Sequence, residues 1–180
     1  MNKNDKPYNV QERMSKMKEL FTRISVRKYT DQPVEEEKIN AILKAAMQAP
    51  SAGNQRPWEF YVVKDPEIIA RLAKASPYGG CAAGAGTLIV PCYRTEGIPF
   101  PEYAQIDLAI ACENLWLEVT SQGLGTVMLG IAPHEDRMAS VEKTLDIPAG
   151  LKPFAIFPIG YPAETRDQQD RYDTARIHYV

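Results

Sequence analysis

The chain of 180 residues is poor in side chains that hold metals or form disulfides. Its three cysteines, Cys81, Cys92 and Cys112, form no Cys-x-x-Cys pair, and its two histidines, His134 and His178, lie in unrelated contexts. This set argues against a metal site, and without a Gly-x-Ser-x-Gly motif it gives no sign of a hydrolase triad. We expect three free thiols that pack as small hydrophobic groups in a reducing compartment.

Excess charge and long apolar runs are also missing. The formal net charge is −2, with acids and bases spread along the chain. No stretch approaches the run of about 18 apolar residues that a membrane-spanning helix needs. The first six residues are polar, and no apolar core or cleavage site of a signal peptide follows them. We therefore expect a cytoplasmic protein that binds neither nucleic acid nor membrane.

The length fits one domain over residues 1–180, with a loose lead-in over 1–9 and an extended C-terminal arm over 162–180. Apolar periodicity and the placement of proline and glycine predict the elements. These are helices over 11–21, 35–50, 66–75, 103–122 and 134–145, and strands over 59–63, 87–93, 124–129 and 154–161. Their order lacks strict β-α-β regularity and favours an α+β fold, although the pattern alone leaves α/β open.

Two segments carry expectations about assembly. The helix over 103–122 is apolar on nearly all sides, which predicts burial in a core or in a subunit interface, and Gly123 ends it as a C-cap glycine would. The arm ends in residues 177–180, which have the composition of a strand. Such a tail either frays or docks on a neighbouring sheet edge.

The segment 23–29 alternates cations with a hydroxyl. In an extended backbone, Arg23, Ser25 and Arg27 project from one side of the chain. Guanidinium groups offer planar donor forks for phosphate oxygens, and a serine hydroxyl between them completes the set of donors. The pattern therefore suits a phosphorylated ligand. The alternative is a solvated turn between two helices.

Two glycine-containing segments follow. Residues 50–58 form a turn of small residues, closed by Pro57 and leading into a strand; the alternative is a plain loop. Residues 123–130 are explained equally by a C-cap glycine and a buried strand with no ligand. A dinucleotide-binding loop does not fit, because the Gly-x-Gly follows a helix and the third glycine is misplaced.

In this order, and with Gln169–Asp173 near the C-terminus, these segments resemble the nitroreductase family of FMN-dependent oxidoreductases. The resemblance covers the chain from about Phe21 to Val180. It implies a nitroreductase-like fold, with a central and mostly antiparallel sheet flanked by helices. It also implies a homodimer whose subunits exchange their C-terminal arms, with two flavins at the interface.

The resemblance also implies the residues that bind FMN. Those for the phosphate, the ribityl chain and the N1 and O2 atoms of the flavin are Arg23, Ser25, Arg27 and Arg171. The turn that reaches a flavin bound mainly by the other subunit contributes Pro50, Ser51, Ala52 and Asn54. Backbone N–H groups near N5 come from Leu129 and Gly130. Asp107 matches another position near the flavin, although an acid is also favoured near a helix N-terminus without any ligand.

The implied activity is transfer of hydride from NAD(P)H, through a tightly bound FMN, to a small organic acceptor such as a nitroaromatic or a quinone. No side chain matches a catalytic acid or base. Same-fold enzymes of reductive dehalogenation or flavin fragmentation remain alternatives, as does a flavin-binding or storage protein without turnover.

The chain departs from the family in having Gln169 where many relatives carry lysine and Arg56 where glutamine is more frequent. The acceptor, the choice between NADH and NADPH, and the pathway are left open, and we expect the gating residues within 76–103.

Overall fold

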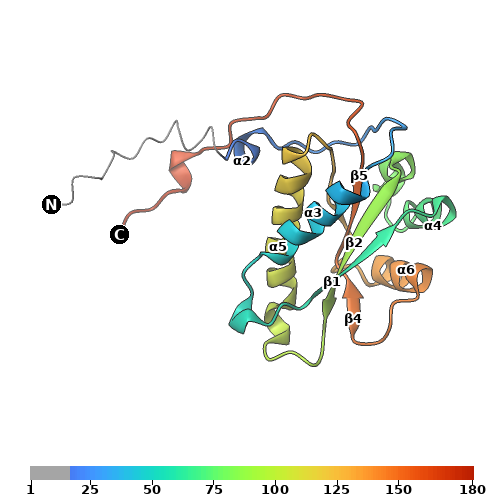
Figure 1. The fold of residues 1–180 in the computed structure, drawn as a ribbon. Helices are drawn as coiled ribbons and strands as arrows, with labels where there is room; N and C mark the ends of the chain where they lie inside the picture. Colours follow the sequence, from blue (N-terminus) through green and yellow to red (C-terminus); the bar gives the residue numbers. More distant parts are fainter. Residues whose placement is uncertain (1–16) are drawn as a thin grey trace.

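A computed structural model describes residues 17–180 and shows a five-stranded, fully antiparallel sheet between two layers of helices (Figure 1). The main path of the sheet is β1-β2-β5-β3, and β4 pairs with β2. Helices α3 and α5 lie on one face, and α4 and α6 lie on the other. The α-helices are α2 (Glu19–Thr22), α3 (Glu36–Met47), α4 (Pro66–Leu72), α5 (Ala104–Ser121) and α6 (Glu135–Leu145). The strands are β1 (Trp58–Val63), β2 (Thr87–Arg94), β3 (Leu129–Gly130), β4 (Leu151–Pro153) and β5 (Ala155–Ile159).

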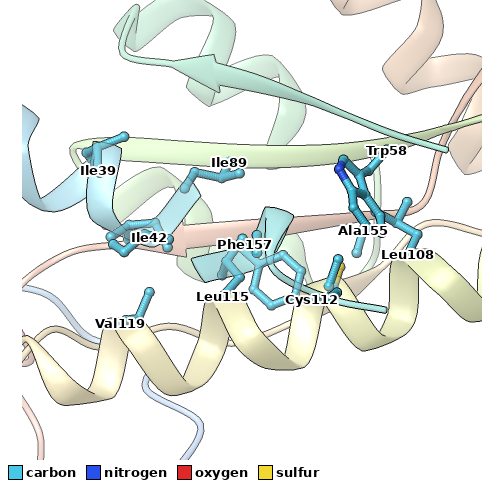
Figure 2. Packing of buried hydrophobic residues seen from close by; sticks show 14 of the residues in the cluster. Ile39, Ile42, Trp58, Ile89, Leu108, Cys112, Leu115, Val119, Ala155 and Phe157 are labelled. Carbon is cyan, nitrogen blue, oxygen red and sulfur yellow. The ribbon is translucent and has the colours of Figure 1, made fainter. Parts of the chain in front are cut away.

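Strand alternation creates two hydrophobic cores, one on each face of the sheet. On β2, Ile89 faces α3 and α5, whereas Leu88 and Val90 face α4 and α6. Figure 2 shows the first core, in which Leu115 of α5 and Phe157 of β5 are packed together. The α+β prediction is confirmed, and the sheet is antiparallel as expected.

Helix α5 is buried along one side only. Its inward residues include Leu108, Cys112, Leu115 and Val119, which Figure 2 shows in a row facing the sheet. Ile106 and Ile110 are exposed in the single chain. The sequence therefore predicted the length of this helix well, but part of its apolar surface is exposed in the single chain. Gly123 follows it with a φ of +71°, as a C-cap glycine does.

Several of the predicted elements differ from the structure or lie outside its described residues. The predicted strand over 124–129 is wrong except at its end. Gly125 forms a bridge with Gly160, whereas the Thr126 carbonyl accepts the backbone N–H of Val26. Neighbouring residues of this stretch therefore pair with two different segments. Strand β4 was missed, since its three residues include a proline. The C-terminal residues 177–180 form no strand within this chain. The predicted helix over 11–21 lies mostly outside the described residues, which hold only α2.

The C-terminal arm leaves the body after residue 162. Its start is tied down, because the Ala163 N–H donates to the Lys28 carbonyl at 2.9 Å and Pro162 bridges Tyr29. Beyond this point residues of the arm line a cavity together with the segment 24–27, and the arm ends away from the sheet (Figure 1). Tyr172 and Tyr179 on the arm are exposed. Within residues 17–180, the helices are too short or too polar to span a lipid bilayer.

The three thiols are free, and their surroundings predict different reactivities. Burial raises the pKa of Cys92 to about 12 and that of Cys112 to about 12. Cys81 is half-buried, and burial raises its pKa as well. Because the thiolate is the reactive form, we expect a thiol reagent at pH 8 to modify Cys81 slowly and the other two only after unfolding. Mass spectrometry of native and denatured protein measures this. Fast labelling of Cys112 in the native protein would contradict the burial described here.

Candidate functional site

The segment 23–30 lies on the edge of the sheet as an extended chain held by backbone hydrogen bonds. The Val26 N–H donates to the Thr126 carbonyl at 2.9 Å, and the Thr30 N–H donates to the Tyr161 carbonyl at 2.9 Å. The buried Val26 side chain packs directly on Gly125, where a Cβ atom would lie 2.7 Å from the Cβ of Val26. The sequence therefore fixes this segment through a close approach that only glycine permits.

Tyr29 anchors the other end of the same segment. Its hydroxyl donates to the Val26 carbonyl at 2.7 Å, and the carbonyl of Pro158 lies 3.4 Å away. Its ring lies over Gly160, where a Cβ atom would come within 2.9 Å of the ring. Burial raises the pKa of Tyr29 far above its ordinary value, so its hydroxyl keeps its proton and acts as a donor. The polar residues between Val26 and Tyr29 are thus held on a rigid backbone.

A cavity of about 240 Å³ lies between this segment and the C-terminal arm. It brings together three predicted residues, Ser25, Arg27 and Arg171, although they lie far apart in the sequence. Its other lining residues are Ile24, Arg166, Asp167, Gln168 and Gln169. Three guanidinium groups, one hydroxyl and two carboxamides against one carboxylate form a donor-rich site. This chemistry fits a phosphate.

Arg23 lies outside the lining of this cavity. Its guanidinium stacks over the ring of Trp116 on α5, with 4.2 Å between Cζ and the ring centroid, and its Nε lies 3.8 Å from Glu113. The stacking orients a cation beside the segment. In this chain Arg23 therefore contacts α5, whereas Ser25 and Arg27 face the arm.

Glu164 at the start of the arm contacts two residues that line the cavity, Arg27 and Arg166. Its carboxylate accepts the backbone N–H of Arg27 at 2.7 Å and the Nη2 of Arg166 at 3.2 Å. The hydrogen bond from Arg27 lowers the pKa of Glu164 below its ordinary value. Nothing in the sequence pattern pointed to Glu164 or Arg166, because their roles depend on how the arm lies against the segment.

This contact predicts a pH-dependent signal at Arg27. The folded-state pKa of Glu164 is lowered, so the stabilisation is present above the unfolded pKa and is lost as pH falls through the folded value. We expect the amide proton of Arg27 to shift with a midpoint below the ordinary carboxyl value of 4.5. Proton NMR titration measures it, and Glu164→Gln is the control that should abolish the transition. A midpoint above 4.5 would contradict the contact.

The turn after α3 has an unusual backbone. Gly53, Asn54 and Arg56 have φ values of +53°, +56° and +46°. Left-handed φ is uncommon for residues with a Cβ, and such positions persist where surrounding contacts impose them. Here the Ser51 hydroxyl accepts the backbone N–H of Arg56 at 2.9 Å. The predicted residues Pro50, Ser51, Ala52 and Asn54 therefore form one constrained turn.

Asp107 supports this turn from α5. The residue is 3% exposed; its Oδ1 accepts the Ala52 N–H at 2.9 Å, and its Oδ2 accepts Nε2 of Gln55 at 2.7 Å. Both carboxylate oxygens are therefore engaged by the chain's own turn. In this arrangement Asp107 holds the turn in place through its hydrogen bonds with Ala52 and Gln55. Gln55 was missed as a functional residue, although it lies within the turn that the sequence singled out.

Leu129 and Gly130 form β3 and pair with Ile156 and Ala155 of β5. The Gly130 carbonyl accepts Nη1 of Arg137 at 3.1 Å. The second glycine-containing segment is thus a short strand whose end is fixed by a side chain from α6. Arg137 was not expected, since an arginine in the first turn of a helix gives no signal of this contact in the sequence.

The turn and the arginine-lined cavity lie at different places in one chain. Asp107 marks the contact of the turn with α5, and Trp116 marks the contact of Arg23, nine residues further along the same helix. This spacing corresponds to about 14 Å along the helix axis. The lining of the cavity includes no residue of the turn. The turn and the cavity are therefore separate features of the single chain.

Comparison with known proteins matches this arrangement to one family. The sequence profile of the nitroreductase family matches residues 20–77 and 77–161. The chain belongs to the nitroreductase family. A relative from Methanothermobacter thermautotrophicus, provisionally named an NADH dehydrogenase/NAD(P)H nitroreductase, is 39% identical over 166 residues, which cover 92% of this chain and 87% of the relative.

Solved structures of the nitroreductase family share the fold. A protein of the same provisional name from Bacteroides thetaiotaomicron has a TM-score of 0.87 and 38% identity, with 92% of this chain and 96% of that chain covered. An FMN-dependent nitroreductase from Clostridium difficile has a TM-score of 0.83 and 29% identity, with 89% and 96% covered. The nitroreductase-like fold expected from the sequence is confirmed.

The donor set of the nitroreductase cavity suits a flavin phosphate better than a metal. Among residues 17–180, no group of three or more His, Cys, Asp or Glu side chains is placed to hold a metal ion. The cavity instead offers hydrogen-bond donors from Ser25 and the three arginines. FMN carries a phosphate dianion, which such donors hold.

Proposed function

We propose that this nitroreductase binds FMN tightly, takes hydride from NAD(P)H and reduces a small organic acceptor such as a nitroaromatic or a quinone. The observation that carries the proposal is the cavity in which Ser25, Arg27 and Arg171 converge with Arg166. The names of the family and of its relatives, which include NAD(P)H nitroreductase and FMN-dependent nitroreductase, support the same activity. Bound FMN supplies two-electron chemistry by accepting and returning a hydride.

The chain's own residues then have distinct tasks. Ser25 and Arg171 hold the phosphate and ribityl chain, and Arg166 adds a cation in place of the lysine that is missing at Gln169. Arg23, which stacks on Trp116 outside the cavity lining, contributes its charge from beside the same segment. Arg27 lies beside N1 and O2, where its positive charge favours the reduced anionic flavin. Backbone N–H groups of Leu129 and Gly130 lie near N5. No catalytic acid or base is proposed, and the protein contributes orientation and electrostatics.

We infer that the active form is a homodimer of one FMN-binding domain spanning residues 1–180, with the C-terminal arms exchanged. The constrained turn does not reach its own cavity, and an apolar groove of about 410 Å³ between α2, α3 and α5 is lined by Met17, Leu20 and Leu117, among others. Exposed Ile106 and Ile110 extend the apolar surface that a second copy would cover. Sedimentation at low micromolar concentration should find a dimer, and a folded, flavin-loaded monomer would contradict this.

The site of action is proposed to be the cytoplasm, because the three cysteines are free and fit a reducing compartment. The cofactor test is chromatography of the flavin released on denaturation, where we expect FMN. The activity test is stopped-flow reduction by NADH and by NADPH. Fast bleaching supports the enzyme, whereas slow bleaching with FMN present points to a storage protein. Release of FAD, or of no flavin, would overturn the proposal.

A further inference from the structure

The loop between β2 and α5 is locked to the constrained turn by one side chain. Gln55 Oε1 accepts the backbone N–H of Phe100 at 2.9 Å, and Gln55 Nε2 donates to the Phe100 carbonyl at 2.9 Å. The same Nε2 donates to Oδ2 of Asp107 at 2.7 Å. The carboxamide therefore pairs with Phe100 as a neighbouring strand would, and the buried carboxylate fixes its orientation.

The Phe100 ring lies on the turn itself. A Cβ atom on Gly53 would come within 2.6 Å of Cε2 of Phe100, so the ring covers the glycine directly. Only glycine leaves room for it there. The residue as a whole is nevertheless 40% exposed. One part of Phe100 thus packs on the turn, and the rest forms an open aromatic surface next to it.

We propose that Phe100 determines specificity for planar aromatic acceptors and that Gln55 is the residue that positions it. The inference rests on the proposed function, in which the turn reaches the flavin of the second subunit. An aromatic ring fixed on that turn extends the turn's surface as a wall of the same acceptor site. Phe100 also lies in the segment 76–103, where the sequence left the gating residues unassigned.

Stacking explains why planarity matters. Aromatic rings gain free energy in offset or edge contacts beyond the area they bury. One NAD(P)H supplies two electrons and one proton as hydride, and a quinone accepts these with one solvent proton to give the hydroquinone. Two ferricyanide ions instead accept one electron each and release the proton. Ferricyanide is octahedral, charged and hydrated, so it gains nothing from an aromatic wall.

The test compares these two acceptors in the flavin-loaded protein. We expect Phe100→Ala to lower kcat/KM for the planar quinone menadione about three- to tenfold. For ferricyanide we expect kcat/KM to change less than about twofold, the lower end of the same scale. Phe100→Leu should lie between wild type and Phe100→Ala. The matched control is Val62→Ala, which truncates a residue of 39% exposure on β1 and should leave both constants unchanged. Equal losses for the two acceptors, or none, would overturn the role of Phe100.

The role of Gln55 needs a readout that general destabilisation does not give. Gln55→Leu should speed hydrogen exchange at the Phe100 amide and lower the menadione-to-ferricyanide ratio as Phe100→Ala does. In the double variant the second change should add little, because both act through one ring. Additive losses would overturn the coupling. Gln55→Asn, which keeps the amide but is too short for all three contacts, provides the same comparison if the leucine variant does not fold.

The outcome also separates this inference from the proposed function. FMN content and NAD(P)H oxidation are measured in every variant. If the wild type binds no FMN or oxidises no NAD(P)H, the proposed function is wrong and the role of Phe100 is wrong with it. If the wild type is loaded and active but the Phe100 variants do not discriminate between the acceptors, only the specificity inference is wrong.

Discussion

Replacing Asp107 with Ala is expected to destabilise the protein by about 2 to 4 kcal/mol, one of the largest effects of any single change outside the two cores. Its carboxylate accepts hydrogen bonds from the Ala52 N–H and from Gln55, and the residue is buried. Truncation removes two charge-assisted hydrogen bonds and leaves a backbone N–H without a partner. Urea unfolding of the apoprotein, followed by circular dichroism, measures the loss.

Asp107→Asn sharpens the test. An asparagine keeps one oxygen for Ala52 but presents an NH₂ group toward Nε2 of Gln55. The Gln55 carboxamide cannot flip to offer its oxygen instead, because both of its ends are hydrogen-bonded to the backbone of Phe100. We expect about half of the loss seen for Ala, roughly 1 to 2 kcal/mol. Glu102→Ala, an exposed acid five residues earlier, is the control and should change stability by less than about 0.5 kcal/mol. Equal stability of all three variants would contradict the buried network.

The second large effect is expected in cofactor affinity. Arg27→Ala and Arg171→Ala each remove a guanidinium from the cavity, and each should weaken FMN binding by about 1.5 to 3 kcal/mol, the usual value for hydrogen bonds to a charged group. This corresponds to roughly ten- to 150-fold in Kd. Titration of the apoprotein with FMN, followed by flavin fluorescence, measures it. Arg176→Ala, on the exposed end of the arm, serves as the control. Unchanged affinity in Arg171→Ala would remove the arm from the site.

Arg27 should differ from Arg171 in the potential of the bound flavin. A charge beside N1 and O2 stabilises the reduced anion, so Arg27→Ala should lower the two-electron potential by about 30 to 60 mV, whereas a phosphate contact leaves it unchanged. Dye equilibration with both variants saturated with FMN distinguishes the two roles. An unchanged potential in Arg27→Ala would assign that residue to the phosphate or the ribityl chain.

Most of the fold was predictable because its signals are local. The apolar stripe of α3, the proline at the start of α4 and the glycine after α5 each mark an element through its own residues. The predictions failed where the local structure depends on contacts with segments that are distant in the sequence. The backbone of Gly125 pairs with Gly160 and that of Thr126 with Val26, and no local sequence pattern predicts that two neighbouring residues pair with different segments.

In the candidate site, too, local features were predictable and contacts between distant segments were not. Alternation in 23–27 predicted that Arg23, Ser25 and Arg27 share a side; Ser25 and Arg27 line one cavity, whereas Arg23 contacts α5. It could not reveal that Arg23 stacks on Trp116 or that Glu164 holds the Arg27 backbone, because both partners come from other elements. Asp107 was predicted to lie near the flavin, with an acid favoured near a helix N-terminus as the alternative. Its contacts with the turn depend on packing between α5 and that loop.

The paired glycines at positions 125 and 160 have a consequence for how this protein can be diversified. Each bridges the other through the backbone, and each lies under a bulky side chain, Val26 and Tyr29 respectively. In a library of random variants, these two positions should tolerate almost no replacement. The loop before Phe100 is exposed at Thr95, Glu96 and Pro99 and should accept many replacements there, although Gly97, with a φ of +68°, should not. New substrate preferences are therefore most accessible by varying that loop while Gly125, Gly160 and the segment 23–30 that packs on them are kept unchanged.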